Sequence, residues 1–538
     1  MAVVLLALAA AALWLFLPNN KARRAVEQTR RNLRQQGFKL DLSEFDLSVP
    51  AGVGANNETL MLAADAARNV FSARRLDLMH PVNSNSAMVT WNRENPSPDM
   101  ANDYLWPDLR NGLAERSGFL DRACQAVISA PFRFKTALTT NGELAPDVYW
   151  ARLLGSAMAA RTIVALHDQQ HAAAFTNLLA LTCLTTAWQT EPMEISHFLR
   201  FRWVALTQRV TWEALQAKDW TDEELARLQH EWETPNFFSG LPETAALARA
   251  STVAFCDYQR RQPAPPGPTL RQFVSELVNS PNHAWSEATS GWRNARYRNY
   301  ESYEDENAWL LYFRDCELDY HKALAANSWA EIRTLPSATN SRPRQASDSP
   351  FGVDASRNVG PGGYGVYQRQ GMTLLARAAE AEARRRLIVT AIAIERSHLA
   401  NHSYPDLLSK LVPDFLQSIP KDFMDGEPLR YHRTDDGRFL LYSVGMDCID
   451  DHGQLLPDAN SRAFPAGPVF GRAEGPDLVW PLPASAAEIQ AYAQANEGRQ
   501  GRGFVKVMTP EGQPFRRYGT GIQPGRTNRP STGPASSF

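Results

Sequence analysis

Apolar residues recur at helical spacing through most of the chain between residues 106 and 260. Over residues 146–166 they share one face of a predicted helix that opens on a proline; this face comprises Tyr149, Leu153, Leu154, Ala157, Met158 and Ile163. The same spacing predicts helices over 106–129, 170–189, 193–217 and 242–260. Because the connections between them are short, we expect antiparallel helical hairpins.

Two further helices complete this middle region. The stretch "WTDEELARLQHEW" begins with a capping box, in which Thr221 caps the helix and Glu224 returns a hydrogen bond to the cap. A long, aromatic-rich helix is predicted over 304–325. Residues 106–334 are therefore expected to form a helical-hairpin domain, preceded over 19–105 by a polar helix and an irregular segment.

The pattern changes after residue 366. A helix with a broad apolar face is predicted over about 369–400, and "GEPLRYHRTDDGRFLLYSVG" follows it. This stretch has two strand-like runs separated by "TDDG", in which Gly437 can supply a positive φ, so an antiparallel hairpin is expected. A long helix packed on a hairpin makes a small α+β unit, which we assign to residues 367–496.

Two segments are rich in Pro, Gly, Ser and Asn or Arg. Residues 335–366 have the composition of a flexible linker, and residues 497–538 that of a disordered tail. The predicted fold class is therefore mainly α, with a helical-hairpin middle and a small α+β end.

An unbroken apolar run, "AVVLLALAAAALWLFLP", covers residues 2–18. Its length is close to that needed to cross a bilayer, and we predict an uncleaved, single-pass transmembrane anchor over residues 1–18. A signal peptide is the alternative, but no basic residue precedes the run and no small-residue cleavage site follows it. The next stretch is basic, with Lys21, Arg23, Arg24, Arg30, Arg31 and Arg34. By the positive-inside rule this flank argues for the cytoplasm.

The composition argues against several classes of function. The chain has 538 residues, of which 44% are hydrophobic, and a formal net charge of -2. A near-neutral balance gives no electrostatic footprint for nucleic acid, so no nucleic-acid partner is expected. The five cysteines are an odd number without a close pair, which argues against a disulfide framework and against a structural zinc site.

Candidate chemistry is sparse. "HDQQH" places His167 and His171 four residues apart, but a zinc protease has H-E-x-x-H, and we expect a turn between two helices instead. "SHFLRFRWVALTQRVTWEAL" interleaves aromatic and basic residues, which suits single-stranded nucleic acid or an amphipathic helix; we favour the helix. We assign no catalytic and no cofactor-binding residue.

The C-terminal unit resembles the soluble head of the major pseudopilin of type II secretion systems. The resemblance covers about 80 residues, from Leu374 to Gly453, and rests on the order and spacing of several short motifs. The matching positions are Tyr404, Pro405, Leu408, Leu411, Pro420, Asp422, Gly426, Leu429, Tyr431, Tyr442, Ser443, Gly445 and Asp447. The whole arrangement is also similar to large membrane-anchored proteins of planctomycete- and verrucomicrobia-type bacteria, which implies an architecture but no activity.

The pseudopilin resemblance implies a calcium site. In that family the loop after Tyr-Ser-x-Gly holds calcium, and Asp447, Asp450 and Asp451 occupy the corresponding loop here. Cys448 stands where the family has Gly. The alternative is that these aspartates form Asx turns in an exposed loop, and we expect Asp422 and Asp425 to be turn residues as well.

Together these observations predict a non-enzymatic, membrane-anchored structural or interaction protein of the bacterial envelope, associated with an envelope or secretion assembly. Expected partners are the membrane, through the N-terminal helix, and proteins, through the helical region. The location is the inner membrane, and the soluble part is placed in the periplasm on the pseudopilin resemblance, against the basic flank. The alternative function is an envelope hydrolase with an acidic site between the helical domain and the C-terminal unit.

Overall fold

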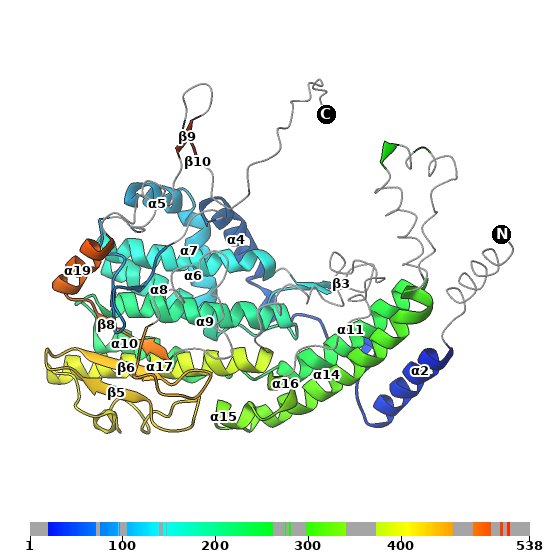
Figure 1. The fold of residues 1–538 in the computed structure, drawn as a ribbon. Helices are drawn as coiled ribbons and strands as arrows, with labels where there is room; N and C mark the ends of the chain where they lie inside the picture. The colour runs from blue at the N-terminus through cyan, green and yellow to red at the C-terminus, as the bar shows by residue number, and fades with distance from the viewer. Residues whose placement is uncertain are drawn as a thin grey trace, which may run out of the picture. The chain divides into compact units, whose positions relative to one another are not determined.

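The computed structural model describes residues 20–71, 76–94, 96, 105–138, 144–146, 148–261, 275, 279–280, 297–339, 373–455, 477–496, 506–508 and 514–516. Helices dominate, and the predicted mainly α class is confirmed (Figure 1). The chain divides into two compact units, Met1–Ala484 and Ser485–Phe538. The second unit contributes the helix α19 (Ala486–Asn496) and an antiparallel pair, β9 (Lys506–Met508) with β10 (Pro514–Arg516).

The predicted helices of the middle region are present with shifts of a few residues. The helices of the first unit are α2 (Asn20–Gln35), α3 (Ala51–Gly54), α4 (Asn57–Phe71), α5 (Trp106–Ala114), α6 (Ser117–Ser129), α7 (Val148–His167), α8 (His171–Thr186), α9 (Glu194–Leu215), α10 (Asp222–Glu233), α11 (Leu241–Arg261), α14 (Ser302–Leu324), α15 (Trp329–Ile332), α16 (Pro336–Thr339) and α17 (Leu374–Asn401). The prediction of one helix over 106–129 is wrong, because the helix is interrupted at Glu115 and Arg116. Arg116 has a φ of -118° and a ψ of 7°, and α6 begins at the next residue.

The capping box of α10 is formed as predicted. Thr221 accepts a hydrogen bond from the amide of Glu224, and the Glu224 carboxylate accepts one from the Thr221 amide. The Glu224 side chain also reaches His171 at the start of α8, with 2.9 Å between Nε2 and Oε2. A local capping signal therefore also joins two helices.

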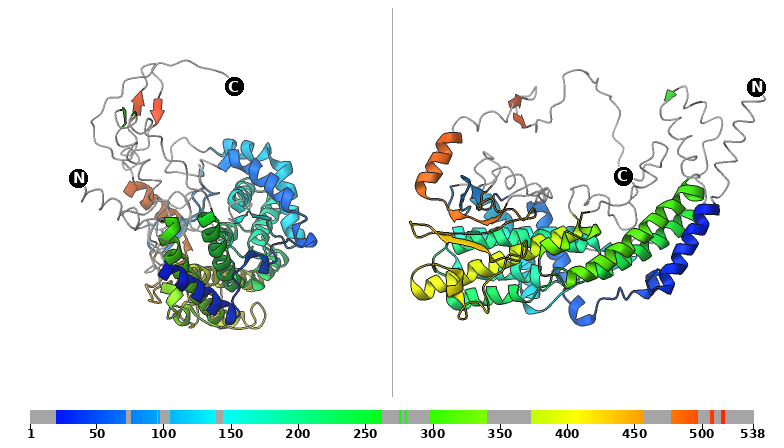
Figure 2. Two further views of the ribbon diagram at one scale, coloured as in Figure 1. Left: turned by 90° about the vertical axis from the view of Figure 1, so that its right-hand side faces the viewer. Right: turned by 60° about the horizontal axis from the view of Figure 1, so that its bottom comes forward.

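The helix α17 lies inside the first unit and packs against α9 and α10 (Figures 1 and 2). Its apolar residues belong to the same hydrophobic core as those of α7, α8 and α9. The predicted boundary between residues 106–334 and 367–496 thus runs through one shared core among the described residues.

Three consecutive arginines connect α17 to three different elements. Arg384 donates to the Oε1 of Gln208 on α9, Arg385 to the backbone oxygen of Trp232 on α10, and Arg386 to the backbone oxygen of Lys421. Each arginine also pairs with a glutamate one turn earlier on α17, either Glu380 or Glu382. The planar guanidinium can serve a carboxylate and a second acceptor at once, which suits a helix surrounded by partners.

The predicted hairpin is present and is part of a larger sheet. The strands β5 (Arg430–Arg433) and β6 (Phe439–Ser443) pair antiparallel, and β7 (Leu478–Trp480) adds to the free side of β6. A second sheet joins β1 (His80–Pro81), β2 (Ser86–Met88) and β8 (Leu482–Pro483), with β2 and β8 parallel. A third pair is β3 (Thr136–Leu138) with β4 (Leu144–Pro146). The strands β7 and β8 were not predicted, and β8 joins the end of the first unit to β2 in its N-terminal part.

The helices α11, α14 and α2 pack side by side (Figure 2). Arg30 of α2 donates to Glu306 of α14, at 2.5 Å, and to Asp257 of α11, at 2.9 Å. Glu306 is fully buried and also accepts from Arg260 of α11, at 2.6 Å. An ionic network therefore fixes the first described helix to the two long ones.

Several predictions fall on residues that the structure leaves undescribed. The apolar run over 2–18 lies entirely outside the described residues. Among the helices that are described, none has the length and apolar character needed to cross a bilayer. Most of the predicted linker over 335–366 and of the predicted tail over 497–538 also lies outside them, apart from α16, β9 and β10.

Candidate functional site

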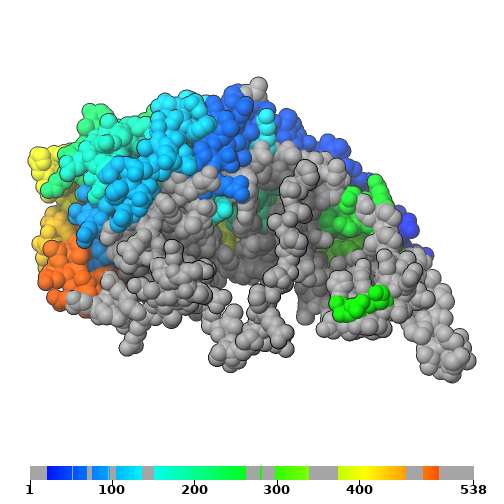
Figure 3. All heavy atoms as spheres, turned by 90° about the horizontal axis from the view of Figure 1, so that it is seen from above, coloured from blue at the N-terminus to red at the C-terminus, as the bar shows by residue number. Residues whose placement is uncertain are grey.

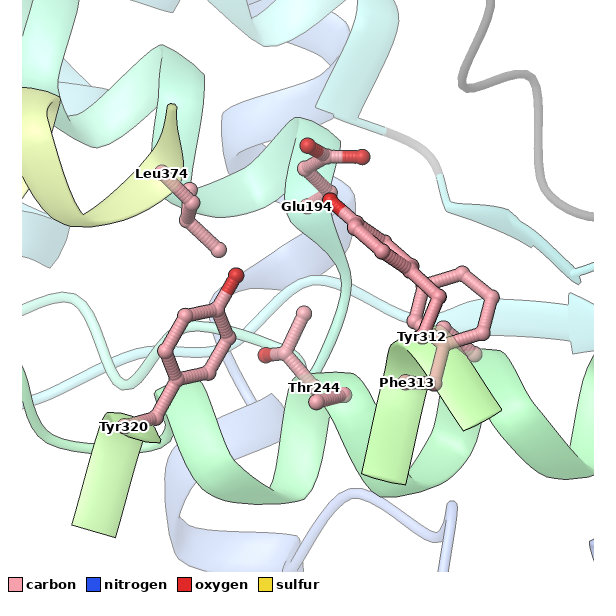
Figure 4. A pocket seen from close by; sticks show the side chains of 8 residues that line it. Glu194, Thr244, Tyr312, Phe313, Tyr320 and Leu374 are labelled. Carbon is pink, nitrogen blue, oxygen red and sulfur yellow. The ribbon is translucent and has the colours of Figure 1, made fainter. Parts of the chain in front are cut away.

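A half-open pocket lies where α9, α11, α14 and α17 meet (Figure 4). Its empty volume is about 290 Å³, including the solvent at its mouth. The lining residues are Glu194, Thr244, Ala245, Ala248, Tyr312, Phe313, Tyr320 and Leu374. The pocket thus sits between the helical middle region and the first residue of α17, where the sequence placed the site of its alternative enzyme.

The polar residues of the pocket lie in the first turns of two helices, α9 and α11. Glu194 is in the first turn of α9 and is 6% exposed, while Thr244 is in the first turn of α11. The Thr244 hydroxyl donates to the backbone oxygen of Gly240, at 2.8 Å, so the Nε2 of His197, 3.0 Å away, is placed to donate to Thr244. Burial, with the nearby Arg200 charge, lowers the pKa of His197 to about 3. His197 is therefore neutral at physiological pH and orients Thr244.

The aromatic side of the pocket comes from α14. Burial raises the pKa of the Tyr320 phenol well above its usual value. Next to it, burial raises the pKa of the Cys316 thiol to about 12, although Tyr312 and Tyr320 hydrogen-bond to it. A nucleophilic cysteine needs a thiolate, so Cys316 is not activated here.

The cysteine chemistry gives a direct test. Cys124, Cys183, Cys256 and Cys316 are buried, and only Cys448 is partly exposed. Iodoacetamide at pH 8.5 should therefore modify the folded protein once, at Cys448, and mass spectrometry should count one adduct. The Cys448→Ser variant should take up none, whereas both proteins should label fully in denaturant.

Labelling of Cys316 in the folded protein would contradict this description. It would mean that the packing around Cys316 opens far enough to admit the reagent, since burial otherwise keeps the thiol protonated and covered.

The pocket offers limited acid–base chemistry. Of the residues that line it, Glu194 is the single carboxylate. Glycoside hydrolysis and related acid–base reactions use two carboxylates on opposite sides of the reacting bond. The polar groups of the described lining are a carboxylate, a threonine hydroxyl and two tyrosines, and they do not present such a pair.

Two of the three predicted calcium ligands, Asp447 and Asp450, serve as turn acceptors. Asp447 accepts a hydrogen bond from the amide of Ile449, at 3.0 Å, and Asp450 from the amide of His452, at 2.9 Å. These are the Asx turns of the alternative interpretation, which is confirmed at both positions. The Asp451 amide donates to Asp477, at 3.4 Å.

Within the described part of the chain, no three His, Cys, Asp or Glu side chains are grouped in a way that could hold a metal ion. The calcium prediction for Asp447, Asp450 and Asp451 therefore gains no support from the geometry.

Asp422 is the hydrogen-bonding centre of the segment that carries β5 and β6, within the first unit. It is fully buried and accepts from the Ser443 hydroxyl, at 2.7 Å, and from the amides of Val444 and Met424, both at 2.9 Å. Arg430 approaches it to 3.5 Å and pairs more closely with Asp425. Asp425 is a turn residue as predicted, since it accepts from the Glu427 amide. For Asp422 that prediction was incomplete, because its carboxylate also fixes the end of β6.

Other positions that carry the pseudopilin resemblance are also structural. The Tyr431 hydroxyl donates to the backbone oxygen of Pro405, and the Tyr404 hydroxyl to Glu395 of α17. Burial raises the pKa of Glu395 to about 8. Gly426 and Gly445 have positive φ. These contacts hold the segments of this region together.

The two remaining motifs have structural positions. His167 ends α7 and stacks on Trp106, whereas His171 begins α8 and meets Glu224, so the predicted turn in "HDQQH" is confirmed. In α9 the aromatic residues of the interleaved motif are buried, and Arg200 donates to the backbone oxygens of Thr185 and Thr186 at the end of α8. The motif therefore forms an internal helix, and its rings are not available to stack on bases.

Comparison with known proteins adds no assignment. No known protein family, no curated protein and no solved structure matches the chain.

Proposed function

We propose that this protein is a non-enzymatic, membrane-anchored structural or interaction protein of the bacterial envelope. The apolar run over residues 2–18 is the anchor, and the helical body with its small C-terminal sheets is the interaction part. Association with an envelope or secretion assembly, with the body on the periplasmic side, follows from the pseudopilin resemblance.

The observation that carries the proposal is the attachment of α2. This helix begins two residues after the apolar run, and the network of Arg30, Glu306 and Arg260 fixes it to α11 and α14. Thr29 adds a hydrogen bond to Asn307, at 2.7 Å. A helix held in this way transmits force and position from an anchor to the body, which a flexible linker would not do.

The buried ionisable side chains support a structural role. Glu191 and Glu213 are fully buried and accept hydrogen bonds from the backbone of other segments. Arg200 binds the end of α8, and Arg384 to Arg386 bind three elements around α17. Because each of these side chains bonds to another element of the fold, we propose that together they hold one packing arrangement.

Alkaline carbonate extraction of bacterial membranes tests the anchor. The full chain should stay in the membrane pellet, while a matched chain lacking residues 2–18 should move to the supernatant. Release of the full chain by carbonate would show that it is not an integral membrane protein.

A reporter fused after Phe538 tests the side of the membrane. A periplasm-active phosphatase should be active there, with the same fusion to the chain lacking residues 2–18 as the inactive control. An inactive phosphatase on the membrane-inserted full chain would place the body in the cytoplasm.

The second candidate is an envelope hydrolase, and the position of the pocket favours it. Glu194 would be its acidic residue and Thr244, oriented by His197, its hydroxyl. If a hydrolase activity were found for the full chain, Glu194→Gln should abolish it, whereas the exposed Glu115→Gln should not.

A further inference from the structure

We infer that the outward face of α2 binds the headgroups of anionic phospholipids. This inference rests on the proposed membrane anchor and adds a lipid preference to it. The side chains of α2 divide between a buried apolar face and an exposed basic surface.

The apolar side of α2 is already occupied. Ala22, Val26 and Leu33 are buried, and Leu33 packs with Leu310 of α14 in a small hydrophobic cluster. Arg30 is directed to the same side by its contacts with Glu306 and Asp257. The helix therefore has no free apolar face that could insert into a bilayer.

The opposite side of α2 is basic and exposed. Arg24 and Arg31 lie there, and Lys21, Arg23 and Arg34 are exposed at its flanks, against a single exposed acidic residue, Glu27. Glu27 pairs with Arg23, at 2.9 Å. Figure 3 shows blue N-terminal residues at the surface, at the right-hand edge of the view.

Arg24 and Arg31 lie at the centre of this face. They are seven residues apart, which is about two helical turns, and so they point in nearly the same direction. At about 100° per residue they lie almost opposite Val26 and Leu33, on the side away from α14. Arg31 also donates to Gln28, at 3.2 Å, and carries no ion pair among the described residues.

The position and the charge of this basic surface indicate that its ligand is an anionic lipid headgroup. The face begins within a few residues of the apolar run, so an inserted run would hold it at the membrane surface. Basic residues at that distance attract anionic headgroups, and the attraction fades within a Debye length. Because the apolar side of α2 is covered by α14, the helix cannot insert into the bilayer. It can still contact lipid phosphate groups at the membrane surface.

Native mass spectrometry of the full chain tests the inference. The protein is held in nonionic micelles that contain equal amounts of phosphatidylglycerol and phosphatidylcholine, and the two lipid adducts are counted. We expect strong enrichment of phosphatidylglycerol, and the Arg24→Gln/Arg31→Gln variant should lose about 30-fold in this preference. The matched control is Lys410→Gln/Lys421→Gln, which removes the same charge from exposed positions elsewhere and should keep the preference.

Other results of these experiments would contradict the lipid preference or assign the binding to free anions. Equal retention of both lipids, or equal loss in the two double variants, would overturn the inference. Displacement of the lipid by 10 mM inorganic phosphate would also overturn it, because the face would then bind free anions. Carbonate extraction of the same proteins reports the anchor alone, so a protein that stays in the membrane without a lipid preference refutes only this inference. Circular dichroism should show equal melting temperatures for all variants, since the replaced side chains are exposed.

Discussion

Replacing Asp422 with alanine should lower the free energy of unfolding by about 3–5 kcal/mol. The carboxylate is fully buried, and three donors depend on it: the Ser443 hydroxyl and the amides of Val444 and Met424. Each buried donor left without an acceptor costs about 1–3 kcal/mol. The loss should also separate β6 from the turn that precedes β5. Urea denaturation followed by circular dichroism measures the change.

A matched aspartate provides the control. Asp406 lies in the same unit with 73% of its side chain exposed, and its partner is the exposed Arg433. Asp406→Ala should cost less than about 1 kcal/mol, because an exposed ion pair contributes little. If both variants lost the same small amount, Asp422 would be an ordinary turn residue and the hydrogen bonds around it would carry no net stability.

Local patterns predicted the helices well. The segment that became α7 shows apolar residues at helical spacing, although the helix is buried on nearly all sides and begins at Val148, after Pro146 of β4. The capping box at Thr221 marks the start of α10 to the residue. The hairpin followed from "TDDG", in which Gly437 has a φ of 80°. These features depend on neighbours in the sequence, so a single sequence is enough to find them.

Contacts between distant segments could not be predicted in the same way. Ser86 pairs with Leu482 in a parallel bridge, although both strands are too short to show a period. The α17 sequence predicted one broad apolar face, but charged residues of this helix, such as Arg377 and Glu382, are buried as well. Their burial depends on partners supplied by other elements, as Arg385 shows with Trp232.

In the acidic loop, too, the role of each aspartate depends on contacts that the local sequence does not reveal. A cluster of aspartates predicts either a cation or turns, and the sequence kept both possibilities open. The difference lies in the partners: Asp447 and Asp450 accept hydrogen bonds from amides two residues ahead. Asp422 differs from them because β6 returns to it, and this contact joins residues that are far apart in the chain. Pocket residues such as Glu194 and Tyr320 carry no sequence motif, so no signal marked them.

Glu213 should make the stability of the protein fall as the pH rises. This residue of α9 is fully buried, and it holds the segment that carries β1 and β2. Its carboxyl group accepts from the amides of Met79 and Thr90, both at 2.7 Å, and from the Thr90 hydroxyl, at 2.8 Å. Burial raises its pKa from 4.5 to about 7, although these hydrogen bonds and Arg93 oppose the shift.

The sign follows from the proton that the folded protein keeps. Between pH 4.5 and about 7, folded Glu213 is protonated while the unfolded chain has released the proton. The stabilisation by this group is therefore complete below pH 4.5 and is lost as the pH rises through 7. Glu213→Gln resembles the protonated form and does not titrate. The wild type should thus lose about 3 kcal/mol relative to this variant between about pH 4 and pH 8.

Urea denaturation of both proteins at several pH values measures this difference. Comparison with the variant removes the contributions of other buried acids, such as Glu191 and Glu395, because both proteins share them. The exposed Glu115→Gln serves as the control and should follow the wild type at every pH. A wild type that instead gained stability over the variant as the pH rose would show that the amides of Met79 and Thr90 hold Glu213 ionised. The link between α9 and the β1–β2 segment would then be a buried charge and not a neutral hydrogen bond.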